Sequence, residues 1–180
     1  MIFTDKGIDQ RKIDRLLGKP ISVDFKRPIT IGSSGLFLKS LIEKTGKTDS
    51  IATNSKCNFE KRENGLLLHS NINNQRTLIP IHKSEIFEVE LIRGTENIEP
   101  IPLFPMWILL KMGVSIVYAR YFRIYVGEYS IDEMKLNIKT TDHDMDFIAN
   151  GYLFEKQLDF FKECNLGNIL KIKPAPNNKT

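Results

Sequence analysis

The stretch SEIFEVELI, residues 84–92, decides the fold class, because apolar and acidic side chains alternate along it. One side of an extended chain would carry the apolar residues Phe87, Val89 and Leu91. The opposite side would carry Glu88 and Glu90. A period of two residues is typical of a strand with one buried face. We therefore predict a strand here, with the two glutamates facing solvent.

Short runs of the same kind follow one another from Cys57 onward, and turn residues separate them. Asn64-Gly65 is a hairpin signal because these residue types accept positive φ at little cost, and the polar NNQ at 73–75 marks a second turn. We expect seven antiparallel strands: CNFEK (57–61), LLLHSNI (66–72), RTLIPI (76–81), SEIFEVELI (84–92), VSIVYARYFRIYVGEY (114–129), MKLNIKT (134–140) and DMDFIA (144–149).

One amphipathic helix is predicted after these strands, in YLFEKQLDFFKEC at 152–164. Phe154, Leu158 and Phe161 recur at the spacing of a single helix face, and Asn150 is a candidate cap. Such a helix can close one open end of a small barrel. The fold class we expect is mainly β with α: a seven-stranded antiparallel bent barrel capped by a C-terminal helix, preceded by a small α/β extension.

This order is similar to the pleckstrin-homology-like superfold, a seven-stranded bent barrel closed by a C-terminal helix. The resemblance covers roughly 57–172. It rests on RTLIPIHKSEIFEVELIRG (76–94), which looks like the third and fourth strands of bacterial members, and on YLFEKQLDFFKEC in the place of the closing helix. The fold hosts many unrelated functions, so the resemblance by itself implies little about the function of this chain.

Two features depart from the pattern of that family. Many members have a tryptophan in the closing helix, where this chain has Phe160 and Phe161. Members that bind phosphoinositides have a lysine, then a second basic residue and an arginine two positions later. The nearest match here is Lys61, Asn74 and Arg76, with an amide in the second position.

The first third of the chain has a different character. We expect residues 1–56 to form a basic extension with two short helices, at 8–17 and 36–44, a strand at 21–25 and a linker at 45–56. Residues 57–172 would form the barrel domain, and 173–180 a flexible tail. Gly-Lys-Thr at 46–48 is not a phosphate-binding loop, because Leu41 stands where the loop needs its first glycine.

Charge is unevenly distributed. The chain has a net charge of +4, and the first 56 residues contain eleven basic against six acidic residues. This excess indicates an anionic partner, or alternatively a solvated face that keeps the protein soluble. The candidate partner- or anion-binding residues are Arg27, Phe37, Lys39, Lys44, Lys47, Lys61, Arg62 and Arg76.

The function we expect is that of a non-catalytic binding or scaffold module that recognises a protein partner or an anionic surface such as a membrane. The alternative is a metal-assisted enzyme that uses the cluster Asp142, His143, Asp144 and Asp146, since carboxylates bind hard cations. A hairpin turn explains the same aspartates. We predict no cofactor and no catalytic residue, and leave the oligomeric state open.

Nucleic-acid binding is not the expected role. The run YARYFRIY (118–125) alternates rings and cations, but no RNA-binding signature accompanies it, and strand packing explains most of the rings.

The apolar run FPMWILLKMGVSIVYA, at 104–119, is shorter than a membrane span needs, and Lys111 interrupts it. A helical turn at 106–112 followed by a buried strand explains it. Cys57 and Cys164 form no disulfide framework, and the N-terminus lacks the apolar core of a signal peptide, so we expect a cytoplasmic protein.

Overall fold

A computed structural model describes residues 2–4, 7–21, 32–33, 35–44 and 51–175. The protein is mainly β with several helices. The strands are β1 (Phe3–Thr4), β2 (Leu36–Glu43), β3 (Ile51–Arg62), β4 (Gly65–Ile72), β5 (Gln75–His82), β6 (Ile86–Ile92), β7 (Glu96–Ile98), β8 (Tyr129–Ile131), β9 (Met134–Thr140), β10 (His143–Ala149) and β11 (Leu170–Lys173).

Four α-helices and five described 3-10 turns connect or cover the strands. They are α1 (Gln10–Leu17), η2 (Lys83–Glu85), α2 (Pro105–Lys111), α3 (Ile116–Ala119), η3 (Arg120–Phe122), η4 (Val126–Glu128), η5 (Gly151–Leu153), α4 (Phe154–Glu163) and η6 (Gly167–Ile169).

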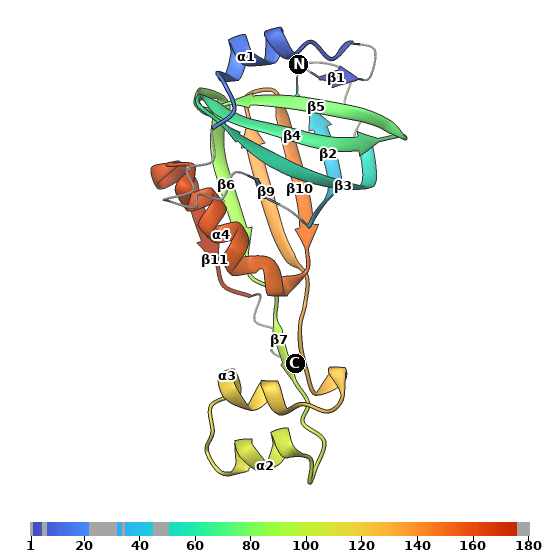
Figure 1. Ribbon diagram of the computed structural model, residues 1–180, viewed down its shortest axis with the longest axis vertical. Coiled ribbons are helices and arrows are strands. Elements are labelled where there is room, and N and C mark those ends of the chain that lie inside the picture. The colour runs from blue at the N-terminus through green and yellow to red at the C-terminus, as the bar shows by residue number, and fades with distance from the viewer. Residues whose placement is uncertain (1, 5–6, 22–31, 34, 45–50, 176–180) are drawn as a thin grey trace.

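Nine strands form one mixed sheet in the order β1-β5-β4-β3-β2-β10-β9-β6-β11. All neighbours are antiparallel except β11, which runs parallel to β6. The sheet bends strongly, so that β3, β4 and β5 cross the direction of β6, β9 and β10, and α4 lies over β6 and β9 (Figure 1). The ladder ends at β1 and β11, so the described strands do not close into the expected seven-stranded barrel.

Both predicted turns and the predicted amphipathic helix are present, but the first turn is centred on Glu63 and Asn64, and neither Asn64 nor Gly65 has the positive φ expected of it. Arg62 pairs with Gly65 around a two-residue turn, and Asn73 and Asn74 have φ of 52° and 60° in the next one. Positive φ at both central residues suits the right-handed twist of a hairpin. Helix α4 buries the apolar residues Phe154, Leu158, Phe160 and Phe161.

The main core lies between this helix and the sheet. Phe59 of β3 meets Phe147 of β10 edge-on at 5.2 Å between ring centroids, and it meets Phe161 of α4 at 5.9 Å. Edge-to-face pairs at these distances add to the free energy of apolar burial. A smaller core under α1 joins Phe3, Ile13, Leu17, Leu67 and Leu78.

Helix α1 is the predicted N-terminal helix, and it starts two residues later than expected. Asp9 caps it by accepting from the backbone N–H of Arg11. Arg62 of β3 is 5% exposed and reaches α1, where Nη1 lies 2.7 Å from Asp14 Oδ1. Its Nε also lies 2.7 Å from Glu60 Oε1.

The predicted helix at 36–44 is wrong, because Leu36–Glu43 is strand β2. It lies between β3 and β10, which supply its hydrogen bonds. A register shift between Leu38 and Ser40 moves the next buried residue to Leu41, and this spacing resembles helical periodicity. Residues 51–56 of the expected linker belong to β3. Most of the strand predicted at 21–25 lies outside the described residues. Residues 45–50 of the predicted linker lie outside them as well.

The strand at 84–92 is confirmed as β6, with Val89 and Leu91 buried. Simple alternation predicted that Phe87 shares the buried face, and this is wrong. A register shift between Ile86 and Glu88 leaves Phe87 62% exposed. The glutamates are not simply solvated. Strand β11 lies beside them, and Glu88 binds Lys139 and Lys171 while Glu90 binds Lys173.

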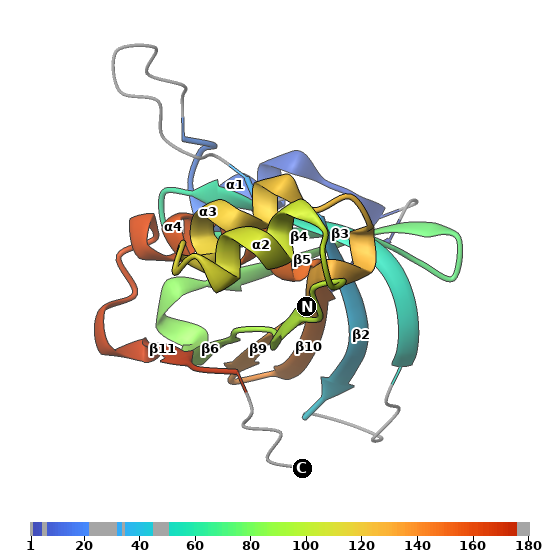
Figure 2. The same ribbon diagram turned by 90° about the horizontal axis from the view of Figure 1, so that it is seen from below.

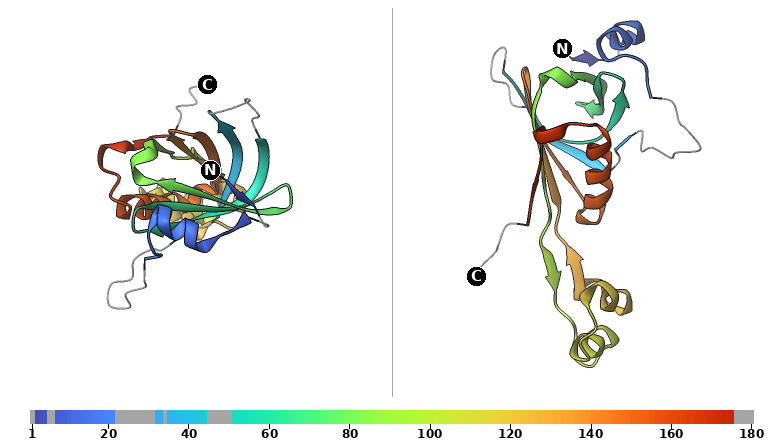
Figure 3. Two further views of the ribbon diagram at one scale, coloured as in Figure 1. Left: turned by 90° about the horizontal axis from the view of Figure 1, so that it is seen from above. Right: turned by 90° about the vertical axis from the view of Figure 1, so that its left-hand side faces the viewer.

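Between β6 and β9 the chain leaves the sheet and forms a projection, residues 93–133, which we call the arm. It contains β7, α2, α3, η3, η4 and β8 and extends away from the sheet (Figures 1 and 3). Seen from below, α2 and α3 form its end (Figure 2). The helical turn predicted at 106–112 is confirmed as α2. The strand predicted at 114–129 is wrong, because residues 116–122 are helical and the strand of this region, β8, starts only at Tyr129.

Candidate functional site

The base of the arm is a two-stranded ribbon that prolongs β6 and β9 beyond the sheet. Glu96, Asn97 and Ile98 of β7 pair with Ile131, Ser130 and Tyr129 of β8. At its start the N–H of Asp132 donates to the carbonyl of Thr95 at 2.9 Å. The backbone of Gly94 lies so close to Asp132 that an added Cβ would sit 2.0 Å from its carbonyl oxygen. This close approach explains a glycine at the exit from the sheet.

The end of the arm has a small core of its own. Met106 of α2, Ala119 of α3 and Tyr129 of β8 are buried together, and Leu109, Leu110 and Ile116 pack against them. Ser115 caps α3 by accepting from the N–H of Val117 at 3.4 Å. The two short helices therefore hold each other, and they are not continuous with the main core.

A buried carboxylate fixes the return of the chain. Glu128 is 0% exposed, and its oxygens accept from the backbone N–H groups of Tyr125 at 3.1 Å, Ile124 at 2.8 Å and Ile101 at 3.3 Å. These donors, Tyr125 first, hold the pKa of Glu128 below its usual value although burial opposes them. The carboxylate stays charged and joins the two segments that flank the helices.

Two arginines on the arm meet tyrosines. Arg120 donates to the hydroxyl of Tyr129 at 3.1 Å and lies over the rings of Tyr121 and Tyr129, 5.3 and 5.4 Å from their centroids. Arg123 donates to the carbonyl of Tyr129 at 2.7 Å and to the hydroxyl of Tyr152 at 3.1 Å. These five residues line a depression of about 330 Å³.

Large apolar side chains are concentrated on the arm. Twelve of the eighteen that are exposed in the described part of the chain lie between residues 98 and 126. Among them, Leu103 is 77% exposed, Met112 72% and Tyr121 74%. The remaining nine are Ile98, Phe104, Ile108, Val117, Tyr118, Phe122, Ile124, Tyr125 and Val126.

Charge on this part of the arm has one sign. The sequence from Pro100 to Gly127, which we call the tip, contains Lys111, Arg120 and Arg123 and has no Asp, Glu or His. Lys111 Nζ lies 5.6 Å from the ring centroid of Trp107. Sequence reasoning treated the tip as a buried strand and a helical turn. A run of 28 residues without an acidic side chain, in a chain that is 27% charged, was the signal that could have marked it.

The sequence-predicted binding residues do not form one patch. Lys61 and Arg62 lie at one end of the β3–β4 pair, whereas Arg76 pairs with Asn71 near the other end of β4. Phe37 and Lys39 are exposed on β2. Lys44 Nζ lies 2.7 Å from Asp144 Oδ1, and donates to the carbonyl of Thr140 at 2.9 Å. Arg27 and Lys47 lie outside the described residues.

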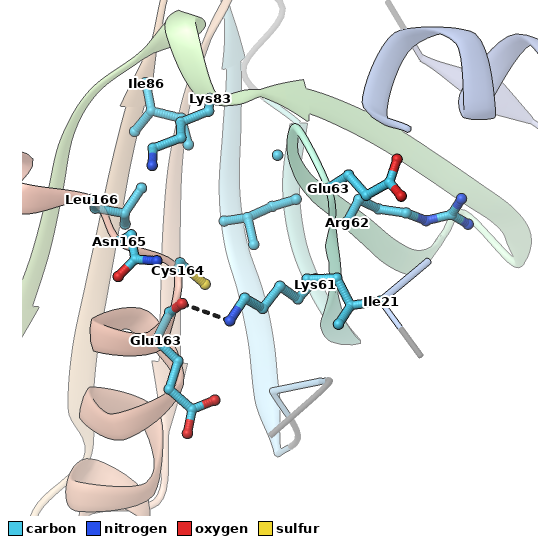
Figure 4. A pocket seen from close by; sticks show the side chains of 12 residues that line it. Ile21, Lys61, Arg62, Glu63, Lys83, Ile86, Glu163, Cys164, Asn165 and Leu166 are labelled. Atoms are coloured by element: carbon cyan, nitrogen blue, oxygen red, sulfur yellow. Dashed lines mark hydrogen bonds between the residues drawn. The ribbon is translucent and has the colours of Figure 1, made fainter. Parts of the chain in front are cut away.

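A pocket of about 240 Å³ opens between the β3–β4 turn and the end of α4 (Figure 4). Lys61 reaches across it and donates to the carbonyl of Glu163 at 2.5 Å. Arg62 points away from Lys61, toward α1 (Figure 4). Cys164 also lines the pocket, and burial raises its pKa to about 11, so its thiol is protonated at neutral pH. An anion in this pocket would meet Lys83 and Lys61, whose Nζ already donates to Glu163. It would also meet two carboxylates, those of Glu63 and Glu163, which would repel it.

The pleat of β10 separates His143 from Asp144 and Asp146, and each of these two aspartates has a partner of its own. His143 is buried, and burial lowers its pKa. Asp144 binds Lys44, and Asp146 accepts from the hydroxyl of Ser40 at 2.5 Å. Within the described ranges, no three His, Cys, Asp or Glu side chains come together as metal ligands.

Comparisons with family models, with curated proteins and with solved structures each gave no match. Among the helices in the described part of the chain, none has both the length and the apolar character that a membrane span requires.

Proposed function

We propose that this chain is a non-catalytic binding module that presents a docking arm on a pleckstrin-homology-like framework. Seven antiparallel strands in the order β5-β4-β3-β2-β10-β9-β6, followed by α4 over the sheet, support this framework. Strands β1 and β11 then extend the sheet at its two ends, and the arm is an insertion between the fifth and sixth strands of the seven.

The exposed apolar surface of the arm is the single observation that carries the proposal. Soluble monomers rarely expose contiguous apolar patches of more than a few hundred Å², and larger ones mark interaction sites. Of the exposed large apolar side chains in the described ranges, two-thirds lie within this one insertion. The small core under them and the buried Glu128 keep the arm ordered, so it can present these side chains at little entropic cost.

The occupant of this surface is a protein partner or an anionic surface. The basic residues of the first third add little to the binding of this partner, since Lys44 and Arg62 already bind carboxylates within the chain. We place the protein in the cytoplasm, where the free thiols of Cys57 and Cys164 stay reduced.

Removing the arm tests this proposal. Thr95 and Asp132 are already hydrogen bonded across the ribbon, so an Asn-Gly turn can replace 96–131 and leave the sheet intact. In an extract of the source cells, the full chain should appear in membrane fractions or in complexes larger than itself, and the armless variant should not. Circular dichroism and thermal unfolding of the armless variant check that the sheet still folds. The proposal is wrong if both proteins distribute identically.

A further inference from the structure

We propose that the tip binds the surface of an anionic lipid bilayer, with its apolar side chains in the headgroup region and its cations against lipid phosphates. This inference rests on the proposed function, because it names the occupant of the arm. It is carried by the charge, the residue types and the shape of the tip.

The sign of the charge favours an anionic surface. Lys111, Arg120 and Arg123 form no ion pair with a carboxylate among the described residues. The carboxylate nearest in sequence to the end of the tip, Glu128, is buried, and backbone N–H groups occupy its oxygens, so it does not face the surface of the tip. The exposed acids Glu96 and Glu99 lie on and beside β7, at the base of the arm. The arm thus has an acidic base and a cationic end, and an anionic leaflet attracts the cationic end.

The residue types fit the boundary between water and lipid. Trp and Tyr are enriched at that boundary because one part of the ring system is apolar and another is polar. The tip has Trp107 together with Tyr118, Tyr121 and Tyr125, and Lys or Arg residues accompany these rings. Interfacial segments combine the same apolar, aromatic and basic residues.

The arrangement of the exposed residues suits insertion better than a one-sided protein contact. Ile124, Tyr125 and Val126 are consecutive, and they are 67%, 64% and 71% exposed. Consecutive side chains point in different directions, so one flat partner surface cannot cover all three. A bilayer surrounds a protrusion from several sides. The arm extends away from the sheet, so the end of the arm can reach a surface that the sheet does not touch (Figure 3).

The depression beside the arginines gives the cations a place to meet a phosphate. Arg120 and Arg123 present guanidinium groups there, and the hydroxyl of Tyr152 lies 3.1 Å from Arg123 Nη1. Guanidinium groups bind phosphate oxygens through paired N–H donors. A second copy of this chain is a poor occupant, because two cationic tips would repel each other. An acidic protein is the other outcome that the experiment distinguishes.

Flotation with vesicles tests the inference on the full chain. Phosphatidylcholine vesicles with and without about a third phosphatidylglycerol are the probes, at low and high salt. We expect binding to the anionic vesicles that weakens with salt. Replacing two cations (Arg120→Gln with Arg123→Gln) should weaken it roughly thirtyfold, since each basic side chain near such a surface contributes about fivefold. Arg120→Lys with Arg123→Lys should restore most of it.

Three further variants guard against a folding artefact. Lys111→Gln changes an exposed cation that makes no hydrogen bond with any residue the structure describes, and it should weaken binding about fivefold. Ile124→Ser with Val126→Ser should weaken binding by roughly tenfold or more, because apolar area is lost. Lys156→Gln with Lys162→Gln on α4 is the matched charge control, and Phe87→Ser on β6 is the matched apolar control. Neither control should change binding.

The inference is overturned if the full chain does not float with anionic vesicles, or if the controls weaken binding as much as the tip variants. Association of the full chain, but not the armless variant, with a soluble component of the extract would overturn it as well, while leaving the proposed function in place. If removing the arm changes neither the flotation with vesicles nor the distribution in the extract, both this inference and the proposed function are overturned.

Discussion

Arg123 joins the arm to η5, the turn that precedes α4, because its Nη1 donates to the hydroxyl of Tyr152 at 3.1 Å. The same hydroxyl donates to the carbonyl of Tyr129 at 3.3 Å, and the two tyrosine rings meet edge-on at 6.3 Å. Arg93, at the start of the arm, also binds Glu155 and lies over the ring of Phe154. Beyond this base, the contact of Arg123 and Tyr129 with Tyr152 ties the arm to the segment before α4, and we expect it to help set the direction of the arm.

We expect Tyr152→Phe to loosen the arm without unfolding the sheet. The ring contact with Tyr129 is kept and only the hydroxyl is lost, so the free energy of unfolding should fall by no more than about 1 kcal/mol. Amide hydrogen exchange should accelerate in 96–131 and stay unchanged in β3, β4 and β10. Equal protection throughout the arm would show that this contact does not orient it.

Acid should open the arm before it unfolds the sheet. The pKa of Glu128 is lowered in the folded protein, so its contribution to stability is complete above the ordinary carboxyl range and is lost as pH falls through the lower folded value. Trp107 is the only tryptophan and lies in the arm, so its emission reports this opening. Glu128→Gln should show the opened spectrum at neutral pH and lose the acid step. A wild-type acid step that persists in this variant would contradict the assignment.

Asp14→Ala should destabilise the protein by about 1–3 kcal/mol, because it leaves the buried guanidinium of Arg62 with one carboxylate in place of two. Urea unfolding followed by circular dichroism measures this. Asp14→Asn keeps an acceptor oxygen and is the control, with a smaller expected loss. If the two substitutions cost the same, the charge of Asp14 has no part in holding α1.

Both cysteines should react slowly with thiol reagents at neutral pH. Burial raises the pKa of Cys57 to about 12 and that of Cys164 to about 11, so little thiolate is present. For Cys164 the thiolate fraction falls roughly a hundredfold relative to a free thiol. Timed labelling and mass spectrometry should show both sites blocked in the native state and labelled in urea. Fast native labelling of Cys57 would contradict its place in the main core.

Local rules in the sequence predicted the parts of the fold that local interactions determine. Positive φ at Asn73 and Asn74 sets the geometry of their own turn, and the spacing of Phe154, Leu158 and Phe161 fixed one face of α4. Strand β2 was missed because a register shift near Leu38 distorts its period, and its hydrogen-bond partners are distant in sequence.

The arm was missed for a related reason. Rings and β-branched residues at 114–129 favour a strand only where a neighbouring strand pairs with them, and most of this segment has none. Local hydrogen bonds to Ser115 and Glu128 determine its conformation instead. Phe87 was misplaced because alternation cannot reveal the shift beside it. The basic residues were found in the sequence, but their partners, such as Asp14 for Arg62, appear only in the fold.

Tryptophan emission on addition of vesicles tests the central claim most directly, since Trp107 is the only tryptophan and lies in the tip. With anionic vesicles we predict a shift of the emission maximum to shorter wavelength and quenching by lipids that have a quencher just below the headgroup. In Ile124→Ser with Val126→Ser the same shift should need roughly tenfold more lipid or more. An unchanged spectrum, or quenching only from the aqueous phase, would contradict the account.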